Sequence, residues 1–93
     1  MTRVVHVRKS KFDIYIGRGF AEFSESDWAN PFHIGKDGNL NEVLRKYRGH
    51  ILSRPDLIAR LHELKDKTLG CWCQGKHACH GDVLVELVNE LVL

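Results

Sequence analysis

The sequence predicts a small α/β domain, in which a short β-sheet packs with about three helices in the order β-β-loop-α-α-β-α. Three observations lead to this fold class: two strand-like segments near the N-terminus, two central stretches with apolar residues at helical spacing, and an apolar strand followed by an amphipathic last segment. At 93 residues the chain is expected to form a single domain, residues 1–93. Its hydrophobic fraction of 43% argues against disorder.

Two strands are expected first. Residues 4–7 are rich in β-branched side chains, and residues 12–16 are strand-like as well. The polar residues between them favour a turn, so we expect these two strands to pair with each other. Residues 17–39 carry repeated Gly, Asn-Pro and Asp-Gly signals and predict a long loop. A loop of this length in so small a domain is usually functional or ordered by a ligand.

The remaining elements follow from apolar periodicity and from capping residues. A helix is expected to begin near Asn39 or Asn41, either of which can cap it. A second short helix is expected after Ser53, with Pro55 in its first turn. Residues 68–73 predict a central strand, and the last helix is expected to run from about Gly81 to the end.

Charge and hydropathy narrow the class of protein. The N-terminal segment is basic and can meet an anion such as a phosphate, although a solvated, charged surface is the favoured explanation for Lys9 and Lys11. The net charge of +2 does not identify a nucleic-acid-binding protein. No apolar run is long enough to span a membrane, and the N-terminus is too polar for a signal peptide. We therefore expect a cytoplasmic protein whose cysteines are thiols or metal ligands rather than disulfides.

The first candidate site is the segment from Cys71 to Asp82, which holds all three cysteines. The first N–H groups of a helix attract negative charge and lower the pKa of a nearby thiol. Cys79 is therefore the candidate catalytic residue, with His80 as its base or hydrogen-bond partner. The alternative is a structural role, above all for Cys71 on the central strand, because cysteine is among the most buried residue types.

Zinc is the second interpretation of the same segment. Cys71, Cys73, Cys79 and one histidine, His77 or His80, supply the thiolate and imidazole ligands that zinc prefers. Their spacing differs from the two-residue gap of a usual zinc knuckle. A redox pair between Cys73 and Cys79 is a further alternative, which lacks the Cys-x-x-Cys motif.

The N-terminal half holds a second group of candidate residues, which are expected to bind a ligand: Arg8, Tyr15, Arg18, Trp28 and Asn30. Arginine side chains match the oxygens of phosphate or carboxylate in pairs, and aromatic rings stack on a base or a sugar. Asn30 offers both a donor and an acceptor. The alternative is that Trp28 and Phe32 anchor the loop to the core. Together with Cys73, Cys79 and His80, the candidate residues are expected to line one pocket.

As a set, these motifs resemble the family known as domain of unknown function 4326. The resemblance rests on Tyr15-Ile16-Gly17-Arg18, on Asn30-Pro31-Phe32 after Trp28, and on Gly70-Cys71-Trp72-Cys73 before Cys79-His80-Gly81-Asp82. It extends over nearly the whole chain, from about Val4 to Leu87. It implies a small bacterial or phage protein and supports the choice of site residues, but it implies no reaction. Ala29 departs from the glycine that commonly precedes the Asn-Pro-Phe triplet.

The expected function is binding of a nucleotide-like or nucleic-acid-like anionic ligand, with hydrolysis by Cys79 or His80 left open. One alternative is a non-catalytic binding module stabilised by zinc. Another is a phage-type regulator that binds a host protein, or a second copy of itself, through the apolar last helix. The expected location is the cytoplasm, which is the host cytoplasm if the chain is phage-encoded.

Overall fold

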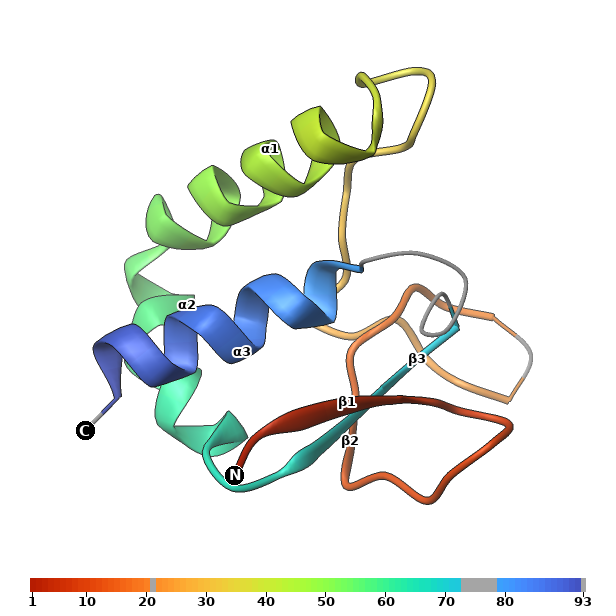
Figure 1. The fold of residues 1–93 in the computed structure, drawn as a ribbon, viewed down its shortest axis with the longest axis vertical. Helices are drawn as coiled ribbons and strands as arrows, with labels where there is room; N and C mark the ends of the chain where they lie inside the picture. Colours follow the sequence, from red (N-terminus) through yellow and green to blue (C-terminus); the bar gives the residue numbers. More distant parts are fainter. Residues whose placement is uncertain (21, 73–78, 93) are drawn as a thin grey trace.

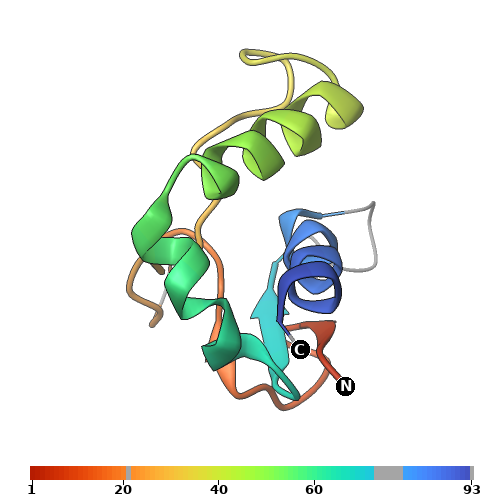
Figure 2. The same ribbon diagram turned by 90° about the vertical axis from the view of Figure 1, so that its left-hand side faces the viewer.

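The computed structural model describes residues 1–20, 22–72 and 79–92. It confirms the mixed α/β fold and the predicted order of elements (Figure 1). The elements are β1 (Arg3–His6), β2 (Ile14–Tyr15), α1 (Leu40–Leu52), α2 (Pro55–Arg60), the short 3-10 helix η1 (Leu61–Leu64), β3 (Thr68–Cys71) and α3 (His80–Leu91). Figure 2 shows α1, α2 and η1 following one another in an arc that faces α3 and the strands.

The three strands form a parallel sheet in the order β1-β3-β2. The prediction that residues 4–7 and 12–16 pair with each other is wrong, because each of these strands pairs with β3 instead. Residues 7–13 do not form a tight hairpin turn; they return the chain to the start of β2 so that it runs parallel to β1. The apolar strand β3 thus has a hydrogen-bonding partner on both sides. This confirms the prediction that it is the central strand.

The two faces of β3 are covered differently. Leu69 and Cys71 point toward the helices and are buried in the main apolar core. Gly70 faces the opposite side, where a Cβ atom would lie 2.6 Å from Cγ of Phe12. Phe12 therefore packs directly on the backbone of the central strand, and no side chain larger than hydrogen fits at position 70 without a shift.

Side-chain caps fix where the longer helices begin. Asn39, rather than Asn41, caps α1: its Oδ1 accepts a hydrogen bond from the backbone N–H of Glu42 at 2.9 Å, and the Glu42 carboxylate accepts one from the N–H of Asn39 at 3.0 Å. Cys79 is the corresponding residue of α3, which begins one residue before the predicted Gly81. Asp82 completes that cap by accepting a hydrogen bond from the N–H of Cys79 at 2.9 Å.

The long loop is tied to the helical layer by one buried hydrogen bond. The hydroxyl of Tyr47 on α1 donates to the backbone carbonyl of Trp28 at 2.7 Å, and both side chains belong to the core. This bond holds the second half of the loop against α1 and thereby positions the residues around Asn30. In the part of the chain that the structure describes, no helix has the length and apolar character needed to cross a membrane.

We expect Gly70→Ala to lower the free energy of unfolding by about 1–3 kcal/mol, since the new methyl group would overlap the base of the Phe12 ring. The matched control is Gly49→Ala, on α1, where a Cβ atom meets nothing within 4 Å. It should instead stabilise the protein by roughly 0.5–1 kcal/mol. Urea unfolding of the two variants checks both values. Equal effects of the same sign would contradict the close contact between Phe12 and β3.

Candidate functional site

The structure does not bring the candidate residues into one pocket, as the sequence predicted, although several of them follow the strands at the same edge of the sheet. Because all three strands are parallel, their carboxyl ends lie together, and ligands of open parallel sheets commonly bind outside this edge. Arg8 follows β1 in the chain, Tyr15 ends β2 with Arg18 three residues later, and α3 begins at His80. The candidate side chains fall into three separate places. Some are buried at the start of α3, some belong to an aromatic group, and others line a cavity.

The predicted catalytic residues belong to the buried group. His80 is 7% exposed, and its Nε2 donates to the backbone carbonyl of Ile16 at 2.6 Å. Burial lowers the pKa of His80, so the ring is neutral at pH 7. Cys79 is 2% exposed and accepts a hydrogen bond from the N–H of Gly81 at 3.3 Å. These contacts give both side chains structural roles at the start of α3 and leave neither facing solvent.

Two of the predicted zinc ligands touch each other in the same buried group. The sulfur atoms of Cys71 and Cys79 lie 3.2 Å apart, so the end of β3 and the cap of α3 are in direct contact. Cys73, which was also predicted to contact the ligand, and His77 lie outside the described residues. Across residues 1–20, 22–72 and 79–92, no group of three or more His, Cys, Asp or Glu side chains is placed to hold a metal ion.

The outer face of the sheet, opposite the helices, carries an aromatic cluster that we define as Phe12, Tyr15, Phe20, Phe23 and Trp72. The Tyr15 and Phe23 rings stack at 4.5 Å, the Phe20 and Trp72 rings stack at 5.2 Å, and Phe23 meets the edge of Trp72 at 6.0 Å. Only Tyr15 of this cluster was among the predicted ligand-binding residues. The sequence did contain a signal for Trp72. Side chains alternate along a strand, so Trp72 is expected on the face opposite the buried Cys71.

Arg8 and Tyr15 are both engaged within this aromatic group. The Arg8 guanidinium lies 5.0 Å from the centre of the Trp72 ring and donates two hydrogen bonds to the Glu22 carboxylate, at 3.0 and 2.9 Å. The Tyr15 hydroxyl accepts from Nε1 of Trp72 at 3.1 Å and donates to the backbone carbonyl of Arg18. Desolvation raises the pKa of Tyr15, so its hydroxyl keeps its proton at neutral pH.

Arg18 and Asn30, two further predicted ligand-binding residues, lie together on the long loop. The Arg18 guanidinium donates to the backbone carbonyls of Asn30, at 2.8 Å, and Phe32, at 2.7 Å. Asn30 is 9% exposed, and its Oδ1 accepts from the N–H of Phe32 at 3.0 Å. These bonds hold the loop in a compact turn that presents Arg18 and Asn30 to a cavity of about 600 Å³.

The cavity lies between the loop and the helices α1 and α2. Its lining combines three arginines, two histidines and three carboxylates: Arg18, Arg54, Arg60, His33, His50, Glu25, Asp27 and Asp56. Only Arg18 was identified from the sequence as a ligand-binding residue of this set, and His50 was assigned no role. Glu25, Asp27 and His33 lie on the same loop as Arg18. The rest of the set comes from α1, from α2 and from the turn between them, and it meets the loop only because the loop packs against these helices: His50, Arg54, Asp56 and Arg60.

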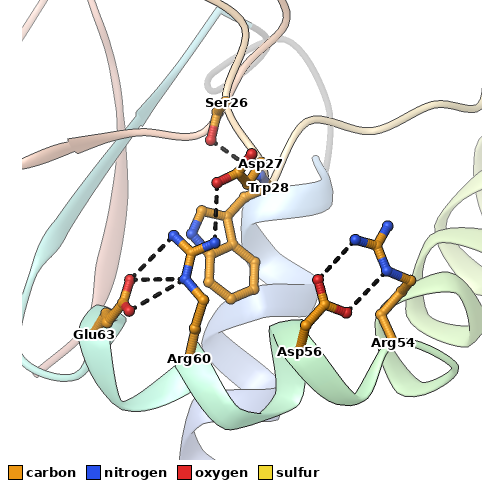
Figure 3. Close-up of polar contacts among 7 residues, drawn as sticks. All are labelled: Ser26, Asp27, Trp28, Arg54, Asp56, Arg60 and Glu63. Carbon is orange, nitrogen blue, oxygen red and sulfur yellow. Dashed lines mark hydrogen bonds and ion pairs between the residues drawn. The ribbon is translucent and has the colours of Figure 1, made fainter.

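Most of the arginine charge around the cavity is already paired, as Figure 3 shows. Arg54 forms two hydrogen bonds to Asp56, at 3.0 and 2.8 Å. Arg60 bonds Asp27 at 2.9 Å and also contacts Glu63, while its guanidinium lies 5.7 Å from the centre of the Trp28 ring. Trp28 is 3% exposed. The structure thus places Trp28 in the core, as the alternative interpretation of this residue proposed, and its ring is covered rather than presented to a ligand.

The last helix uses most of its apolar face inside the domain. Val83, Leu84, Leu87 and Val88 are buried in the core, and Leu91 near the end of α3 is 49% exposed. A partner or second copy bound through this helix stays a prediction, with Leu91 as the exposed apolar residue that it would contact.

Comparison with known proteins supports the resemblance seen in the sequence. Residues 2–90 match the family described as Domain of unknown function (DUF4326). An uncharacterized protein of Acanthamoeba polyphaga mimivirus is 41% identical over 86 residues, which cover 81% of this chain and 65% of the viral protein. An uncharacterized 12.4 kDa protein from the nrdA-td intergenic region of Enterobacteria phage T4 is 34% identical over 96 residues, covering 98% and 81%. The chain thus spans just under two thirds of the mimivirus relative. No solved structure matches it.

The burial of His80 predicts a pH dependence of stability. In the unfolded chain His80 takes up a proton as the pH falls below its ordinary pKa of 6.5. In the native chain burial lowers the pKa of His80, so the proton binds only at a lower pH. The free energy of unfolding should therefore fall as the pH drops through this range, by up to about 1.4 kcal/mol per pH unit for this one group. His80→Gln keeps an N–H for the carbonyl of Ile16 and removes the titration.

Urea unfolding of wild type and His80→Gln between pH 5 and 8 measures this contribution, because the other histidines are common to both proteins. The stability advantage of the wild type should shrink as the pH falls below about 6.5. A difference that stays constant over the whole range would show that His80 titrates normally in the native state.

Proposed function

We propose that this chain, which belongs to the family Domain of unknown function (DUF4326), binds a nucleotide-like anionic ligand in the cavity between the long loop and the helices α1 and α2. The matched relatives are uncharacterized proteins, so the proposal is carried by the geometry of the cavity. The observation that carries the proposal is that the Arg18 guanidinium is held in the cavity wall by two backbone carbonyls and keeps its positive charge.

Arg18 differs from the other arginines of the cavity in what it contacts. Its hydrogen bonds go to the two backbone carbonyls of Asn30 and Phe32, and within the described ranges it forms no ion pair. Neutral carbonyls orient the guanidinium without cancelling its charge. Arg54 and Arg60, by contrast, are matched with carboxylates. Arg18 is therefore the side chain best prepared to bind a phosphate group, since a guanidinium fixed in advance loses little freedom on binding.

The size and polarity of the cavity support a nucleotide-like ligand. A volume of about 600 Å³ lies in the range of small-molecule sites. The amide of Asn30 can read one edge of a base, and the rings of His33 and His50 offer flat surfaces beside it. Glu25 and the paired carboxylates limit how much negative charge the cavity accepts. This balance favours a ligand with one phosphate group and a neutral base over a polyphosphate.

The proposal covers binding and not hydrolysis. Cys79 and His80, the residues predicted to react, are buried at the start of α3 and do not line the cavity. A nucleophile or general base must reach the atom on which it acts. Arg8 and Tyr15 likewise belong to the aromatic group on the outer face of the sheet rather than to this cavity.

A zinc-stabilised binding module is the second candidate function, and one observation favours it. Tetrahedral zinc with thiolate bonds of about 2.3 Å holds its sulfur atoms roughly 3.7 Å apart. The sulfurs of Cys71 and Cys79 lie 3.2 Å apart, close enough to share an ion after a small movement. Cys73 and His77 would supply the remaining ligands, and zinc would then lock the cap of α3 to the end of β3.

We expect Arg18→Ala to remove the thermal stabilisation that nucleoside monophosphates give the wild type. Loss of the main phosphate contact should weaken binding at least roughly tenfold, which is about 1.4 kcal/mol. The measurement is a melting-temperature series with the adenosine, guanosine, cytidine and uridine 5′-monophosphates, alongside their nucleosides and inorganic phosphate. Stabilisation should require both the phosphate and the base.

The matched control is Arg45→Ala, which removes the same charge from an exposed position on α1. It should keep the stabilisation seen in the wild type. Because Arg18 also ties the loop, Arg18→Lys serves as a second variant that retains the charge while losing the forked geometry. Equal stabilisation of the wild type and Arg18→Ala by every nucleotide would reject the cavity as the binding site.

For the zinc candidate, we expect protein purified without added metal to carry about one zinc ion per chain, and a chelator to lower its melting temperature. Cys79→Ser should lose the metal while keeping an oxygen at the helix cap. Metal-free protein with an unchanged melting temperature in the chelator would reject this candidate. It would leave the nucleotide proposal untouched, because neither Cys71 nor Cys79 lines the cavity.

A further inference from the structure

We propose that the aromatic cluster and the basic loop beside it form a second binding surface, and that this surface binds single-stranded nucleic acid. The surface consists of Phe20 and Trp72 together with Arg8, Lys9 and Lys11. It lies on the outer face of the sheet and shares no lining residue with the cavity at Arg18. The two proposals therefore succeed or fail independently.

The first argument is an exposed ring at the end of an ordered aromatic group. Phe20 is 56% exposed although its ring stacks on Trp72 at 5.2 Å with an angle of 26°. Trp72 in turn is braced by Phe23 and by its hydrogen bond to Tyr15. The open side of Phe20 is thus a flat apolar surface backed by a second ring. Proteins that bind single strands use such rings as stacking platforms, because every base offers a flat face.

The second argument is the position of Arg8 beside this platform. Its guanidinium lies over the Trp72 ring at 5.0 Å and holds the Glu22 carboxylate with two parallel hydrogen bonds. A phosphate presents the same pair of oxygens to arginine. The Arg8 and Glu22 side chains are 54% and 57% exposed, and exposed pairs of this kind contribute little to stability. A phosphate can therefore replace the Glu22 carboxylate at small cost, so Glu22 acts as an internal competitor for the strand.

The third argument is the charge of the neighbouring loop. Residues 7–12 line a shallow hollow of about 570 Å³, and Arg8, Lys9 and Lys11 are its charged residues. Lys9 and Lys11 are exposed. Cations beside an aromatic platform match the alternation of phosphate and base along a single strand. A duplex hides its base faces, and the carboxylate side chains of an acidic peptide offer no flat ring to Phe20, whereas a single strand supplies a ring and an anion at every nucleotide.

The central test measures the affinity of a short fluorescein-labelled oligothymidylate by fluorescence anisotropy. We expect Phe20→Ala to weaken binding roughly tenfold to a hundredfold, the usual cost of removing a stacking ring. Phe20→Trp should retain the affinity, because it keeps a flat ring. The matched control is Ile34→Ala, which removes a similarly exposed apolar side chain, 54% exposed, outside the proposed surface. An oligouridylate arm distinguishes RNA from DNA.

Two further variants test the charge argument. Arg8→Ala should weaken binding and reduce the slope of log K against log salt concentration by about 0.7, as expected for one lost phosphate contact with a single strand. Arg45→Ala, on the exposed face of α1, should change neither. Glu22→Gln should tighten binding several-fold, since it removes the competing charge. Thermal melting of each variant verifies that the fold is intact.

The proposal is overturned if the wild type fails to bind either oligonucleotide. It is also overturned if Phe20→Ala and Ile34→Ala bind equally well, or if a duplex of the same length binds as tightly as the single strand. Equal affinity for inorganic polyphosphate and for the oligonucleotide would also overturn it, since the surface would then bind any polyanion through its positive charge alone. Nucleotide-induced stabilisation through Arg18 is measured separately and is unaffected by any of these results.

Discussion

A parallel sheet has to be covered on both faces, and this requirement governs the rest of the structure. The helices cover one face of β3, where Leu69 and Cys71 enter the core. The other face is covered by aromatic side chains from the segments that precede and follow β2, with Phe12 packed directly on Gly70. The aromatic cluster therefore exists because loops, rather than a helix, complete the sheet. The same loops carry the basic residues beside it.

The sequence was sufficient for the elements of the fold but not for their pairing. Asn39 and Pro55 are local signals, and they placed the starts of the first two helices well because capping depends on residues a few positions apart. Strand pairing depends on what each strand meets after the chain has folded. The polar residues after β1 favoured a hairpin with β2, whereas the apolar β3, formed much later in the chain, takes both strands as neighbours.

The proximity of candidate residues was predictable where they share one segment. Arg18 and Asn30 were recognised from the long loop, and the loop brings them into contact. Exposure could not be predicted in the same way. His80 and Cys79 were expected at the start of the last helix and lie there, but the packing of α3 buries both. The remaining wall of the cavity, including His50 and Arg54, depends on how α1 and α2 meet the loop, which no local pattern encodes.

The pairing of β1 with β3 has a consequence for how the protein folds. Partners in this ladder, such as Arg3 and Thr68, are 65 residues apart in the chain, so the sheet cannot form until β3 meets both N-terminal strands. Contacts within α1 and α2 are local, and local contacts form faster than distant ones. The fold thus separates into helices that can form early and a sheet that is completed late, when β3 joins β1 and β2.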